Sequence, residues 1–153
     1  MKLDIKDNEM VVYLKDEEIK NIDFKDINKL EDYFRNLFIK LKKILKQDIS
    51  GFYIINIYLD DYYGAVLEIN KEESDYIFYL DNQIEMKINI IETDFLYETE
   101  DIFNNKCEYY LYKNKIYLKL KEKLDLKQML YLIEHSKIIY DTENILLSSK
   151  KIL

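Results

Sequence analysis

The side chains most able to do chemistry in this sequence are carboxylates, and they are spread along the chain instead of forming a motif. Paired carboxylates can act as general acid and base, and Glu85, Glu92, Glu98 and Glu100 are candidates for such a pair. Because Asp and Glu together make up 30 of the 153 residues, closeness in sequence says little about function. We therefore assign no catalytic residue.

Acidic residues at predicted turns also offer oxygen ligands of the kind that Ca²⁺ and Mg²⁺ prefer. Asp60 and Asp61 lie at one such turn and Asp81 at another, although acidic turns are most often simply solvated. A metal site of the Cys/His type needs about four sulfur or nitrogen ligands, and one Cys with one His cannot supply them. We expect no metal and no cofactor.

The single cysteine and the single histidine are the remaining candidates for nucleophilic catalysis. His135, followed by Ser136 and Lys137, lies where a helix is predicted to end, and the helix dipole explains a histidine there. Cys107 leads into a predicted strand and is typical of a small core residue. The two glycines are too few to build a phosphate-binding loop or a dinucleotide fingerprint.

Two surface features favour a protein partner instead. Tyrosine offers a large, rigid contact area with a polar end, and one predicted turn is both tyrosine-rich and acidic. A lysine cluster late in a predicted helix could contact an acidic partner. The alternatives are aromatic packing at a strand end and a solvated helix face. The partner-binding candidates are Tyr58, Asp60, Asp61, Tyr62 and Tyr63 at the turn, and Lys40 and Lys43 on the helix.

Composition bounds the class of protein. The chain is 48% hydrophobic with a formal net charge of −7, which argues against a non-specific nucleic-acid binder and against attachment to anionic membranes. One cysteine allows no internal disulfide, the N-terminus lacks a secretory signal, and no apolar run is long enough to span a bilayer. We expect a cytoplasmic protein. The bias toward Lys, Asn, Ile and Tyr indicates an AT-rich genome, bacterial or that of a mobile element.

Two helices are predicted from apolar spacing. The first covers about 26–47, with Asp26 as its N-cap. The second covers about 125–137, where Asp125 and Gln128 resemble a capping box. The predicted apolar stripe of the first helix is Ile27, Leu30, Phe34, Leu37, Leu41 and Ile44, and that of the second is Leu126, Met129, Leu130 and Ile133.

The other regular segments read as strands joined by short turns. They are 3–5, 10–14, 52–59, 65–69, 76–80, 84–90, 109–112, 116–120 and 138–140. Residues 52–59 are apolar on both sides, which favours a central strand covered on both faces, or at least one well inside the sheet. Residues 92–107 could hold a short helix, and residues 141–153 give no clear pattern.

Hairpins with few helices predict an α+β fold, in which helices pack on a mostly antiparallel sheet. We expect one domain over 1–153, with a division into two lobes, if there is one, near 92–107.

The order of the elements resembles that of the MecA-type adaptor proteins of Gram-positive bacteria. The matching segments are Met1 to Leu14, the helix from Asp26, the pair Phe52–Leu59 and Ala65–Ile69, and the tyrosine-rich hairpin Tyr110–Leu118 with the helix after it. The resemblance implies a protein that delivers substrate proteins to a Clp chaperone. It carries over no functional residue.

Three functions fit the sequence. The first is a non-enzymatic protein-interaction or adaptor domain whose partner is unidentified. The second is an enzyme that uses carboxylates or a tyrosine at a divergent site. The third is a self-assembling protein of phage or mobile-element origin, such as a homodimer.

Overall fold

A computed structural model describes residues 2–6, 8–46, 50–72, 84–100 and 107–152. The predicted strand 76–80 lies outside these residues. The fold is mixed α+β, as the sequence predicts, and it divides into two compact units. Unit 1 contains residues 1–57 and 65–91, and unit 2 contains residues 58–64 and 92–153. Each helix among the described residues is too short or too polar to cross a membrane.

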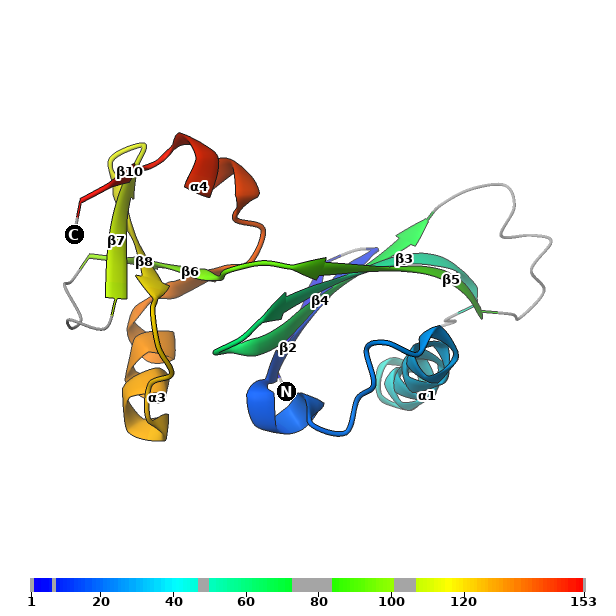
Figure 1. Cartoon of the computed structure of the whole chain (residues 1–153). Coiled ribbons are helices and arrows are strands. Elements are labelled where there is room, and N and C mark those ends of the chain that lie inside the picture. The colour runs from blue at the N-terminus through cyan, green and yellow to red at the C-terminus, as the bar shows by residue number, and fades with distance from the viewer. Residues whose placement is uncertain (1, 7, 47–49, 73–83, 101–106, 153) are drawn as a thin grey trace. The chain divides into compact units, whose positions relative to one another are not determined.

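Unit 1 is built on a five-stranded sheet with the order β1-β2-β4-β3-β5 (Figure 1). The N-terminal hairpin is confirmed, because β1 and β2 pair antiparallel with Lys6 opposite Glu9. A short 3₁₀ helix, η1 (Asp16–Ile19), follows β2. The strands are β1 (Lys2–Lys6), β2 (Glu9–Lys15), β3 (Gly51–Asp60), β4 (Gly64–Glu72) and β5 (Ile84–Glu92).

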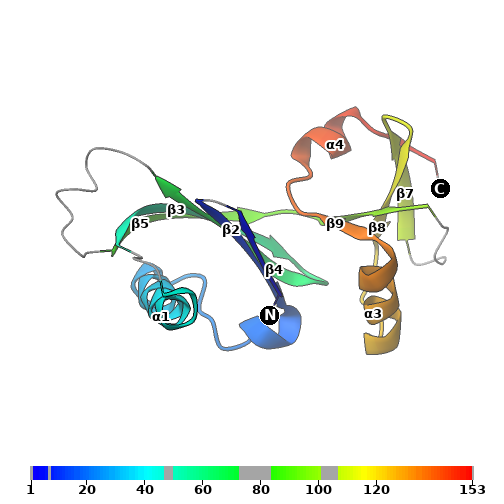
Figure 2. The same ribbon diagram turned by 180° about the vertical axis from the view of Figure 1, so that it is seen from behind.

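The predicted long helix is confirmed as α1 (Ile27–Leu45), which lies along one face of this sheet in both views (Figures 1 and 2). The Asp26 carboxylate accepts hydrogen bonds from two backbone N–H groups of the first turn, as the predicted N-cap should. Four stripe residues are buried: Leu30, Phe34, Leu37 and Leu41.

The ends of the predicted stripe on α1 differ from the prediction. Ile27 is 48% exposed and Ile44 is 72% exposed. Spacing alone places both on the inner side of the helix, but in the structure only the middle turns are covered. There Phe38 stacks on Tyr53 of β3, with 4.6 Å between the ring centroids.

Strand β3 lies inside the sheet, as predicted, between β4 and β5. Of the two predicted alternatives, a strand covered on both faces or one well inside the sheet, the structure shows the second, because buried residues alternate with half-buried ones along most of β3. The half-buried face is polar where Asn56 donates a hydrogen bond to Glu68 of β4 and accepts one from Asn89 of β5. These two hydrogen bonds satisfy the side chain of Asn56, which is the polar residue in an otherwise apolar strand.

Unit 2 has a second five-stranded sheet, with the order β10-β7-β8-β6-β9. The pairs β10–β7, β7–β8, β8–β6 and β6–β9 are all antiparallel. The predicted hairpin at 109–120 and the last predicted strand are confirmed. Within 92–107, for which the sequence leaves a short helix open, residues 96–99 form a strand and residues 101–106 lie outside the described residues. The strands are β6 (Leu96–Thr99), β7 (Cys107–Tyr112), β8 (Lys115–Leu120), β9 (Lys137–Ile139) and β10 (Lys150–Lys151).

Two helices complete unit 2. Helix α3 (Leu126–His135) begins with the predicted capping box. In it Asp125 accepts from the Gln128 backbone N–H at 2.7 Å, and the Gln128 side chain accepts from the Asp125 N–H at 3.4 Å. Helix α4 (Glu143–Ser148) lies in the tail, for which no clear pattern was predicted, and it contacts β7.

Candidate functional site

The tyrosine-rich turn is the tip of the β3–β4 hairpin, and its residues belong to unit 2. The side chains of Tyr58 and Tyr63 are buried. Tyr58 packs on Tyr140 with ring centroids 4.9 Å apart, and Tyr63 packs on Phe95 at 5.7 Å. Both rings therefore contribute to the core of unit 2, which was the plainer of the two sequence interpretations.

The other residues of this tip have different surroundings. Tyr62 is half-buried and its hydroxyl donates to the Lys121 carbonyl at 2.8 Å. Asp61 is exposed. The partner-binding role of the tip stays a prediction, and within unit 2 the exposed Asp61 is the residue of the five that a partner could reach most directly.

Asp60 holds the tip in place. One carboxylate oxygen accepts from the backbone N–H groups of Tyr62 and Tyr63 at 3.0 and 2.8 Å, and the other accepts from Phe95 at 2.9 Å. Burial raises the pKa of Asp60, and these three hydrogen bonds partly offset that effect. Asp60 therefore acts as a structural cross-link of the kind that an Asx turn makes.

A buried polar cluster lies near Asp60. The Tyr97 ring is 1% exposed, and its hydroxyl has no hydrogen-bond partner within the described part of the chain. Burial, together with the charges of Asp60, Tyr63 and Cys107, raises the pKa of Tyr97. Burial also raises the pKa of the Cys107 thiol to about 11, which makes it a poor nucleophile and matches its prediction as a core residue.

The two candidate lysines lie in unit 1. Lys40 and Lys43 are exposed near the C-terminal end of α1. Lysines there complement the negative end of the helix dipole. They belong to a different unit from the hairpin tip, and their partner-binding role stays a prediction.

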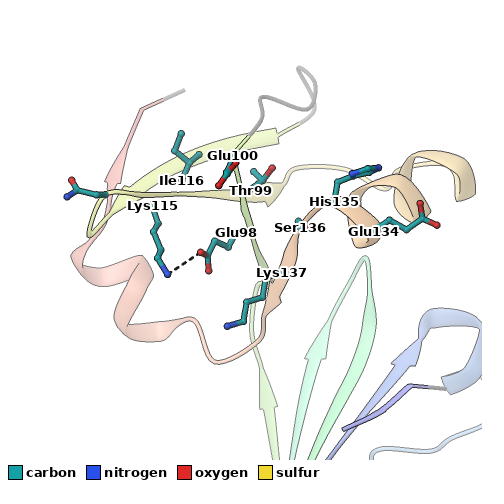
Figure 3. A pocket seen from close by; sticks show the side chains of 10 residues that line it. Glu98, Thr99, Glu100, Lys115, Ile116, Glu134, His135, Ser136 and Lys137 are labelled. Atoms are coloured by element: carbon teal, nitrogen blue, oxygen red, sulfur yellow. Dashed lines mark ion pairs between the residues drawn. The ribbon is translucent and has the colours of Figure 1, made fainter.

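An open pocket of about 700 Å³ lies in unit 2, where the end of β6, the β7–β8 turn and the junction of α3 with β9 meet (Figure 3). Across it Lys115 Nζ pairs with Glu98 Oε1 at 3.2 Å. The lining residues are Glu98, Thr99, Glu100, Asn114, Lys115, Ile116, Glu134, His135, Ser136 and Lys137.

The chemistry of this pocket is that of a wet polar surface. Small-molecule sites are usually lined by apolar side chains with a few convergent polar groups, whereas Ile116 is the one aliphatic residue of this lining. The Ser136 hydroxyl donates to the Leu132 carbonyl, and the His135 ring packs on the Tyr131 ring at a tilt, with 4.2 Å between the ring centroids. Among the described residues no group of three His, Cys, Asp or Glu side chains could hold a metal ion.

Helix α3 has an apolar face that the rest of the described part of unit 2 does not cover. Six of its ten residues are apolar, yet Leu132 is its one buried residue. Leu126 is 66% exposed and Leu130 is 37% exposed. Together with the partly exposed Met129 and Ile133, they form what we call the α3 face: Leu126, Met129, Leu130 and Ile133.

The α3 face corrects a prediction from the sequence. The spacing of its four residues favoured them as the buried side of the helix, but the structure buries Leu132, which lies on another side of it. Because apolar residues surround more than half of this helix, periodicity could not select the inward face. The sequence therefore did contain a signal for the α3 face, because this helix has more apolar residues than one helix face can bury.

No family model, curated protein or solved structure matches this chain.

Proposed function

We propose that this chain is a protein-interaction domain of the adaptor type, without catalytic chemistry of its own, and that the α3 face is its contact surface. The observation that carries the proposal is the exposure of Leu126 and Leu130 on one side of a capped helix. Contiguous exposed apolar side chains mark interaction sites, since burying one Leu is worth about 1.5–3 kcal/mol.

The order of the elements supports an adaptor. A hairpin, a long helix, a second hairpin and the strand β5 form unit 1, and unit 2 contains a tyrosine-rich hairpin followed by a helix. This order resembles that of the MecA-type adaptors, and the resemblance implies delivery of substrate proteins to a Clp chaperone. A cytoplasmic location, where a buried Cys107 thiol stays reduced, belongs to the same proposal.

The shape of the α3 face suits a helical or extended apolar segment of a partner. Its residues repeat at the spacing with which amphipathic helices bind one another. The capping box fixes the start of α3, so the face is held on a preformed helix. A preformed surface binds with less loss of conformational entropy than one that must fold on binding.

Capture of partners from the native cytoplasm tests the proposal. The double variant Leu126→Asp/Leu130→Asp should lose any specific partner that the wild-type chain retains, because it places two charges in the apolar contact. The control variant is Ile44→Asp, which adds a charge at an exposed aliphatic residue of α1 and should retain the partner. A partner retained equally by all three proteins would contradict the assignment of the site to α3.

A further inference from the structure

Two charged residues of opposite sign border the α3 face. Lys127 and Glu134 are both exposed, and they lie seven residues apart on α3. At about 3.6 residues per turn this spacing is close to two full turns, so both side chains border the face on the same side. Among the described residues neither Lys127 nor Glu134 forms an ion pair or hydrogen bond.

This arrangement is complementary to itself. When two identical helices pack antiparallel, residues that border the contact on the same side of each helix meet across it. A two-fold axis near Leu130 would bring Lys127 of each helix beside Glu134 of the other. The same axis would place Leu126 opposite Ile133 and Leu130 near its own copy, so that apolar residues meet apolar residues.

We propose that the α3 face pairs antiparallel with the α3 face of a second copy of this chain, with Lys127 of each copy facing Glu134 of the other. This inference rests on the proposed function, because it names the partner of the same surface. A two-fold contact must be formed by one patch that fits itself, and the order of charges on α3 meets that requirement. A contact with an unrelated protein would not require the α3 face to be complementary to itself.

The contact should be weak and dependent on concentration. A helix of ten residues is about 15 Å long, and one such helix buries less than the roughly 800 Å² per partner of a standard interface. We therefore expect exchange between monomer and dimer over a micromolar range of protein concentration. Such exchange would leave the face available to other proteins when the chain is dilute.

Sedimentation of the whole chain tests the proposal through matched charge reversals. Lys127→Glu alone and Glu134→Lys alone each place like charges at both contacts and should weaken self-association about tenfold or more. An equimolar mixture of the two variants restores both opposite-charge pairs, so it should associate about as well as the wild-type chain. Leu130→Asp should abolish self-association, and it should not associate when it is mixed with Lys127→Glu or with Glu134→Lys. Circular dichroism checks that each variant remains folded.

The outcomes separate this inference from the proposed function. A wild-type chain that stays monomeric at several hundred micromolar overturns the pairing, and a specific partner lost with Leu126→Asp/Leu130→Asp would then still support the interaction domain. A dimer that Leu130→Asp does not weaken assigns self-association to another surface and overturns the pairing too. If the variants fail to associate when mixed although the wild type dimerises, the antiparallel register is wrong.

Discussion

The Asp60 carboxylate accepts a hydrogen bond from the Phe95 backbone N–H at 2.9 Å, across 35 residues of sequence. Its second oxygen accepts from Tyr62 and Tyr63 within the turn. One side chain thus closes a tight turn and ties it to the segment before β6. The rings of Tyr63 and Phe95 pack together at the same place, so the polar and apolar contacts at this tip support each other.

Replacing Asp60 with Asn should destabilise the protein by about 1–3 kcal/mol, because an amide keeps one oxygen acceptor and presents an N–H₂ group to the other donors. The matched control is Asp61→Asn, at the exposed neighbour, which should change stability by less than about 0.5 kcal/mol. Urea unfolding followed by circular dichroism measures both. Equal stability of the two variants would mean that the Asp60 hydrogen bonds do not hold the tip.

The raised pKa of Asp60 predicts how the difference in unfolding free energy between wild type and Asp60→Asn depends on pH. Burial makes the folded chain bind a proton more tightly than the unfolded chain, whose Asp has a pKa near 3.8. The resulting stabilisation is full below about pH 3.8 and is lost as the pH rises through the folded pKa. The gap in unfolding free energy between wild type and Asp60→Asn should therefore be largest in acid and narrow toward neutral pH. A gap that widens instead would show that the hydrogen bonds outweigh burial.

Tyr97→Phe should stabilise the protein by about 1 kcal/mol. The Tyr97 hydroxyl is buried and has no partner among the described residues, so its removal takes away a desolvation cost while the ring keeps its packing. Tyr110→Phe is the control, because the Tyr110 hydroxyl donates to Glu108 at 2.7 Å and its loss should be neutral or destabilising. Thermal unfolding of the three proteins compares them, and a destabilised Tyr97→Phe would mean that the hydroxyl is hydrogen-bonded after all.

Cys107 should react slowly with thiol reagents while the protein is folded. A pKa of about 11 in place of 9.0 lowers the fraction of thiolate at pH 8 about 100-fold, and burial of the sulfur slows the reaction further. Alkylation followed by mass spectrometry should show fast labelling in urea and labelling at least 100-fold slower without it. Rapid labelling of the folded chain would indicate that the first strand of the tyrosine-rich hairpin opens readily.

Two positions of the predicted α1 stripe should respond very differently to truncation. Phe34 is fully buried, so Phe34→Ala should cost about 3–5 kcal/mol. Ile44 is 72% exposed, and Ile44→Ala should change stability by less than about 0.5 kcal/mol. Denaturant midpoints measure both. Similar losses at the two positions would mean that Ile44 is covered in solution, for example by a partner.

The contrast between α1 and α3 explains how much of the fold could be predicted. On α1 a narrow apolar stripe borders a face that carries Lys40 and Lys43, so the spacing identified four buried residues correctly. On α3 the apolar residues extend too far around the helix, and spacing selected the face that the structure leaves exposed. Periodicity identifies an inward face only where polar residues mark the outward one.

The candidate site was harder to predict than the fold. The pocket draws residues from three separate segments of unit 2, and no local pattern joins Glu98, Asn114 and His135. The charges of Lys127 and Glu134 become meaningful only when the exposed side of α3 is known.

The membership of residues 58–64 in unit 2 has a consequence for dividing the chain. A fragment that starts at Glu92 would leave behind the two tyrosine rings that pack on Phe95 and Tyr140, together with the carboxylate that binds the Phe95 N–H. Such a piece would expose aromatic surface and tend to aggregate. A cut between the units therefore cannot be made at a single peptide bond, and a minimal version of unit 2 would have to carry the seven-residue tip as a graft or an added peptide.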